Sequence, residues 1–120
     1  MTTFVITPMA AERWQVDAGD ADIATLDIPP ALGRVRRFEV DVRLVVDCAE
    51  PRAGASHAMT VEVNGRRQWS RQIATHAPSD SLDYHFRVDV PEGAALRVRA
   101  LSRVRVAQRR RLVIEAEEQP

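Results

Sequence analysis

The arginines near the C-terminal end of the chain have the clearest potential for binding chemistry. Seven arginines fall between residues 97 and 111. Four of them share one side of an extended chain, because their position numbers differ by even amounts: Arg97, Arg99, Arg103 and Arg105. A planar guanidinium suits carboxylate and phosphate oxygens. One interpretation is therefore a surface for polyanions or phosphates.

The alternative is a solvated sheet face on which these arginines pair with acids such as Asp83 and Asp89. We favour this alternative because the chain has no net charge, whereas nucleic-acid-binding domains usually have a basic excess. Residues 97–111 also contain no aromatic residue on which a base could stack. Nucleic acid is therefore not an expected partner.

A second candidate surface surrounds the stretch VEVNGRRQW, residues 61–69, which predicts a β-hairpin with Asn64-Gly65 at its tip. A two-residue turn would set Trp69 opposite Thr60 and turn it toward solvent. A three-residue loop with a bulge at Gly65 would set Trp69 opposite Met59, in the core. We expect the second register, because pattern normally fixes register where one face of a strand is buried.

The first register would have a consequence for binding. An outward Trp69 between Arg67 and Arg71 would form a stacking platform for a sugar or a base. The chain would then be a carbohydrate-binding module.

Metal and catalytic chemistry have little support in the sequence. The acidic stretches DAGDAD and SDSLD match no EF-hand spacing, and Asp, Gly and Ser are ordinary turn residues. The three histidines, at positions 57, 76 and 85, form no zinc-binding motif. No nucleophile elbow or glycine-rich phosphate loop occurs. We therefore expect no metal, no cofactor and no enzymatic activity.

Period-two alternation runs through most of the chain and predicts an all-β fold. In FEVDVRLVVDC, residues 38–48, apolar and polar side chains alternate, as in a strand with one face on a core. Similar patterns predict strands over residues 3–7, 12–18, 22–28, 57–63, 66–75, 82–90, 96–100 and 110–117. We expect a two-sheet antiparallel β-sandwich, with the jelly roll as one form and a partly open β-barrel as the alternative.

Strands 82–90 and 96–100 are expected to form a hairpin, because only five residues separate them. In that register Asp89 faces Arg97 and Asp83 faces Arg103. Opposite charges on paired strands stabilise a sheet. These two pairs are the basis for expecting the arginines to be neutralised.

Length and composition indicate one globular domain over residues 1–120. Cys48 is the only cysteine, so it forms no intramolecular disulfide, and its place at the end of an apolar alternation predicts a buried side chain. No apolar run is long enough to span a bilayer. The first residues lack the basic and apolar regions of a signal peptide, so we expect a cytoplasmic protein without a membrane partner.

The segments VEVNG and DYHFRVDVPEGAALRVRA resemble the central strands of jelly-roll sugar-binding modules. The resemblance implies a β-sandwich but transfers no site residue. Together the observations favour a non-catalytic binding or assembly module that contacts a protein, including a second copy of itself. Carbohydrate binding and polyanion binding are the second and third hypotheses.

Overall fold

The computed structural model describes residues 11–49 and 54–120, so the strand expected over residues 3–7 lies outside the described part of the chain. The described residues form strands and turns, and none of them forms a helix that could cross a membrane. The strands are β1 (Arg13–Asp17), β2 (Ile23–Ile28), β3 (Arg36–Asp47), β4 (Ser56–Val63), β5 (Arg66–Ala74), β6 (Ser79–Val90), β7 (Leu96–Arg105) and β8 (Gln108–Glu118).

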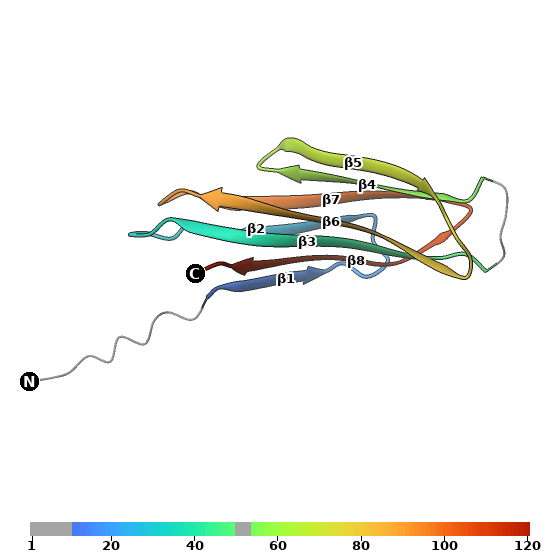
Figure 1. Ribbon diagram of the computed structural model, residues 1–120, viewed down its shortest axis with the longest axis horizontal. Helices are drawn as coiled ribbons and strands as arrows, with labels where there is room; N and C mark the ends of the chain where they lie inside the picture. The colour runs from blue at the N-terminus through green and yellow to red at the C-terminus, as the bar shows by residue number, and fades with distance from the viewer. Residues whose placement is uncertain (1–10, 50–53) are drawn as a thin grey trace, which may run out of the picture.

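These strands form two antiparallel sheets, ordered β1-β8-β3-β6 and β2-β7-β4-β5. The chain passes repeatedly from one sheet to the other, and in the described part only β4 and β5 are consecutive strands of one sheet (Figure 1). Eight strands in two packed sheets with this crossing pattern make a jelly roll. The predicted sandwich is therefore confirmed, and the chain does not form the barrel alternative.

The core lies between the two sheets and follows the alternation of the strands. β3 contributes a continuous buried row, the row of β8 lies beside it in the same sheet, and the row of β7 belongs to the opposite sheet. The row of β3 consists of Phe38, Val40, Val42, Leu44 and Val46. Cys48 extends this row and is 3% exposed, as its position in the pattern predicts.

The hairpin expected between β6 and β7 is wrong. β6 lies against β3, whereas β7 lies between β2 and β4 in the other sheet. Asp89 therefore pairs with Arg37 at 2.7 Å, and Asp83 pairs with Arg43 at 3.1 Å. Alternation predicts which residues face the core, but it does not identify the neighbouring strand, because every strand of a sandwich has the same period.

The turn between β4 and β5 contains two residues. Asn64 and Gly65 have φ angles of 49° and 82°, and Val63 pairs with Arg66, as in a type I′ turn. The backbone N–H of Asn64 donates to the Arg97 carbonyl at 2.9 Å, and the Asn64 side-chain oxygen accepts from the Arg97 N–H at 2.8 Å. Asn64 thus attaches the hairpin tip to the beginning of β7.

A bulge in β5 then changes the register. Gln68 has no partner in β4, so Trp69 lies opposite Val61 instead of Thr60 or Met59. Neither predicted register is therefore correct, because the extra residue lies in the return strand and not in the turn. The face assigned to Trp69 is nevertheless the expected one, since Val61 belongs to the core.

Trp69 is half-buried and closes the side of the sandwich where β5 and β6 form the sheet edges. Its ring stacks on Tyr84 with centroids 4.5 Å apart and planes 6° apart, and Tyr84 stacks on Phe86 at 5.3 Å. The three rings join the edges of the two sheets. Stacked aromatic pairs stabilise a fold by more than the burial of their apolar surface alone provides.

A buried ion network closes one end of the sandwich. Arg36, at the start of β3, is 2% exposed and donates to Glu12 at 2.9 Å. Arg34 donates to both Glu12 and Glu118, and the indole N–H of Trp14 donates to Glu12 at 2.9 Å. This network links the beginnings of β1 and β3 to the end of β8.

Candidate binding surface

The outward side of the sheet β2-β7-β4-β5 carries the four predicted arginines of β7. Arg97 donates to Asp27 at 2.7 Å, and Arg99 donates to Glu62 at 3.3 Å. Arg103 and Arg105 are exposed, and neither makes a hydrogen bond or ion pair with any residue that the structure describes. Two of the four arginines, Arg97 and Arg99, are therefore paired with acids as expected. Their partners belong to β2 and β4, whereas we expected Asp83 and Asp89 of β6.

Five arginines in all lack a partner within residues 11–49 and 54–120, and all of them lie on β5 or β7. The five are Arg66, Arg67, Arg71, Arg103 and Arg105, and we call the three that lie on the outward side of the sheet the Arg-rich face: Arg67, Arg103 and Arg105. Each of the other described arginines makes at least one hydrogen bond or ion pair. Arg67 lies opposite Glu62, and Arg103 and Arg105 lie on the exposed side of β7, so these three share the outward side of the sheet. Arg66 and Arg71 lie opposite the inward-facing Val63 and Met59, on the other side of β5.

A shallow groove crosses this face between β5 and β7. Small side chains of β4 and β5 form its floor, where the hydroxyls of Thr60 and Ser70 lie 2.9 Å apart. Arg67, Arg71 and Arg103 are among the lining residues, and of these Arg67 and Arg103 lie on the outward side of the sheet. The groove therefore offers hydroxyl groups and cationic hydrogen-bond donors to one ligand, a combination suited to carboxylates.

Trp69 does not line this groove, although Arg67 and Arg71 do. The bulge at Gln68 turns the indole toward the core while the neighbouring arginines stay exposed. One face of the indole already contacts Tyr84. The three residues of the predicted sugar platform are therefore divided between two environments.

Arg97 lies on the same outward side of the sheet as the Arg-rich face. Hydrogen bonding and attraction from Asp27 raise the pKa of the neighbouring Arg97 above its already high ordinary value. Clustered cations raise the local positive potential and attract anionic partners from solution. Ionic strength weakens this attraction, since the Debye length is about 8 Å at physiological salt.

The opposite side of the sandwich carries acids in the corresponding central position. On neighbouring strands β3 and β8, Glu39 lies directly opposite Glu117, and Asp41 lies directly opposite Glu115. We call these four carboxylates the acidic face. Glu115 has no hydrogen-bond or ion-pair partner among the described residues. The sequence analysis missed this face because strand alternation does not reveal that β3 and β8 are neighbours.

The predicted acidic loops have local structural roles. Asp17 accepts hydrogen bonds from the Gly19 N–H and from Arg111, and these bonds lower the pKa of the Asp17 carboxyl. Asp80 accepts from the backbone N–H groups of His76 and Ser81. No group of acids, histidines or cysteine with metal-binding geometry occurs within the described ranges.

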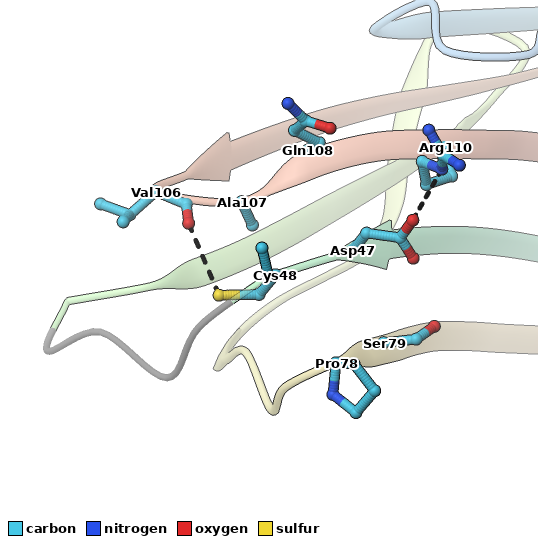
Figure 2. A pocket seen from close by; sticks show the side chains of 9 residues that line it. Asp47, Cys48, Pro78, Ser79, Val106, Ala107, Gln108 and Arg110 are labelled. Atoms are coloured by element: carbon cyan, nitrogen blue, oxygen red, sulfur yellow. Dashed lines mark hydrogen bonds and ion pairs between the residues drawn. The ribbon is translucent and has the colours of Figure 1, made fainter.

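A cavity lies at the end of the sandwich that contains Cys48, Pro78 and Val106 (Figure 2). The Cys48 sulfur lies 3.7 Å from the Val106 carbonyl oxygen, and Arg110 pairs with Asp47 at 2.7 Å. Val106 has a φ of 57°, which is costly for a β-branched residue. The neighbouring segment 50–53 lies outside the described residues, so we assign no site here.

Comparison with known proteins supports the fold and leaves the function open. No protein-family model matches the chain, and no curated protein matches it. A solved structure, dimeric latent PorU from Porphyromonas gingivalis, superposes with a TM-score of 0.59 at 11% identity over 92% of this chain. The chain spans 13% of the length of that protein. At this identity the similarity concerns the fold alone.

Proposed function

We propose that this chain is a non-catalytic binding module that docks an acidic protein surface on its Arg-rich face. One observation carries the proposal: three arginines without a partner among the described residues, Arg67, Arg103 and Arg105, lie on the outward side of one sheet. In a chain with equal numbers of acidic and basic residues, random placement would leave unpaired arginines on both sheets. Arginine is also enriched at the centres of protein interfaces.

An acidic protein fits this surface better than a nucleic acid. The groove has no aromatic lining on which bases could stack. Its paired hydroxyls and flanking guanidiniums suit the carboxylates of Asp and Glu side chains. The shallow shape of the groove suits an extended or flat partner more than an enclosed small molecule.

The cytoplasm is the proposed location of the module. Cys48 is buried and is the only cysteine of the chain, so the domain needs no intramolecular disulfide and suits a reducing compartment. Cell fractionation with an antibody against the chain would test this assignment. Recovery from a secreted fraction would contradict it.

A binding assay with charge-matched variants tests the proposal. The probe is a fluorescent polyglutamate peptide, measured by anisotropy at several salt concentrations. We expect Arg103→Gln/Arg105→Gln to weaken binding by about tenfold, because two Arg–carboxylate contacts contribute about 0.5–1 kcal/mol each. Arg37→Gln/Arg87→Gln removes the same charge from the other sheet and should leave binding intact. Equal losses in both variants, or no binding at all, would refute the proposal.

Heparin and neutral oligosaccharides serve as competing probes in the same assay. Binding to heparin that exceeds polyglutamate binding, with a steep salt dependence, would favour the polyanion hypothesis instead. Binding of a neutral sugar that is lost in Trp69→Ala and retained in Arg103→Gln/Arg105→Gln would favour the carbohydrate hypothesis. Either outcome would contradict the proposed function and support the corresponding alternative.

A further inference from the structure

The chain itself carries a surface that fits the Arg-rich face. The acidic face lies on the outward side of the sheet β1-β8-β3-β6, and the Arg-rich face belongs to the other sheet. The two sheets pack through their inner faces, so these surfaces point in opposite directions. One molecule therefore presents complementary charges on its two sides.

The four acids would gain from additional cations. Glu39 and Glu117 are directly opposed, and so are Asp41 and Glu115. Like charges directly opposite on neighbouring strands destabilise a sheet. Arg87 and Arg13 partly compensate the first pair, at 2.8 and 3.3 Å. His85 forms a hydrogen bond with Asp41 at 2.6 Å, whereas Glu115 has no partner in the described part of the chain.

We infer that copies of this chain stack front to back, with the acidic face of one copy on the Arg-rich face of the next. This inference rests on the proposed function and names its partner. Because the two contacting surfaces differ, the interface is heterologous and leaves a free acidic face and a free Arg-rich face at the ends of each stack. Stacking can therefore continue beyond the dimer.

The overall charge of the chain favours a second copy as the occupant. Seventeen basic and seventeen acidic residues give no net charge, so a growing stack accumulates none. A strongly charged module would repel its own copies at long range. Complementary patches on a neutral chain attract at short range and fix the relative orientation of the partners.

Sedimentation velocity on the full chain tests the stacking. At about 0.02 M salt, the weight-average sedimentation coefficient should rise with protein concentration. At about 0.5 M salt, the Debye length falls to roughly 4 Å and the monomer should predominate. A chain that remains monomeric at low salt would overturn the inference.

Two pairs of variants separate the faces from the net charge. Arg103→Gln/Arg105→Gln should abolish stacking, whereas Arg37→Gln/Arg43→Gln gives the same net charge, removes arginines that pair with Asp89 and Asp83, and should preserve it. Glu115→Gln/Glu117→Gln should abolish stacking, whereas Asp20→Asn/Glu92→Gln has the same net charge, changes turn residues outside both faces, and should preserve it. Circular dichroism confirms that each variant is folded. If each variant and its charge-matched control lost association to the same extent, the stacking would be refuted.

Mixing the two defective variants provides a complementation test. Arg103→Gln/Arg105→Gln retains the acidic face, and Glu115→Gln/Glu117→Gln retains the Arg-rich face. Each should be monomeric alone, and the equimolar mixture should form a dimer that does not grow further. A mixture that stays monomeric would contradict a heterologous interface between these faces.

The polyglutamate assay distinguishes this inference from the proposed function. A wild-type chain that binds polyglutamate but does not self-associate would overturn stacking and leave the proposed function standing. A chain that does neither would overturn both.

Discussion

Glu12 combines several interactions that depend on its negative charge. It accepts hydrogen bonds from Arg34, Arg36 and the Trp14 indole. Burial raises the pKa of the Glu12 carboxyl, but these hydrogen bonds outweigh that effect and lower the pKa below the ordinary 4.5. Since the pKa is lower in the folded state, Glu12 stabilises the fold above about pH 4.5, and this contribution disappears as the pH falls through the folded-state pKa.

We therefore predict that Glu12→Gln destabilises the fold at neutral pH by about 2–3 kcal/mol, since it leaves the buried Arg36 without its carboxylate. The free energy of unfolding of this variant should also fall less steeply than that of the wild type below pH 4.5. Urea denaturation between pH 3 and 7 measures both effects. Glu115→Gln is the control, because Glu115 has no partner within the described ranges. Equal effects of the two substitutions would contradict the role of the network.

The sequence pattern indicates that Arg36 faces the core, but it does not identify the residues that Arg36 contacts. Arg36 shares parity with Phe38 and Val40, so strand alternation alone places it on the core face. Its partner Glu12 lies at the start of a different strand, and their contact depends on the placement of β1 and β3 on either side of β8. Local pattern contains no information on that arrangement.

The β4–β5 hairpin is the element that positions Arg66, Arg67 and Arg71. We predict that Asn64→Ala destabilises the fold by about 1–3 kcal/mol, because alanine disfavours the left-handed φ and removes the side-chain bond to Arg97. Glycine adopts the left-handed φ without strain, so Asn64→Gly loses only the side-chain hydrogen bond to Arg97. We expect it to lower the free energy of unfolding by about 1 kcal/mol. Thermal and urea unfolding measure the difference.

Equal costs for these two substitutions would show that backbone conformation at the turn contributes nothing. A larger cost for Asn64→Gly would contradict the type I′ assignment. Either result would also weaken the assigned register of β5. The positions of Arg67 and Arg71 on the groove depend on that register.

Most strands were predictable from the sequence, whereas their pairing was not. Alternation and turn residues predicted seven stretches that overlap β1 to β5, β7 and β8, and the pattern at residues 82–90 predicted most of β6. The bulge at Gln68 escaped prediction because no glycine or proline marks it. The crossing of residues 91–95 between sheets escaped prediction because a short polar loop is compatible with both a hairpin and a crossing.

At the scale of the whole molecule, the zero net charge conceals a separation of charge between two surfaces. The sequence analysis used the net charge to favour paired arginines, and this reasoning holds for Arg97 and Arg99 alone among the four predicted arginines of β7. Arg103 and Arg105 remain unpaired within the described chain because the jelly roll places Asp83 and Asp89 in the other sheet. The proposed binding role and the proposed stacking both follow from this separation.

The most direct test of the binding role locates a bound acidic chain on the protein. Amide chemical shifts of ¹⁵N-labelled Glu115→Gln/Glu117→Gln, a variant in which stacking is suppressed, would be recorded during titration with polyglutamate peptide. The account predicts shifts concentrated on β5, β7 and the intervening β4, with Arg67, Arg103 and Arg105 among the largest. Shifts centred on β3 and β8, or spread evenly over both sheets, would contradict the assignment of the Arg-rich face as the binding surface.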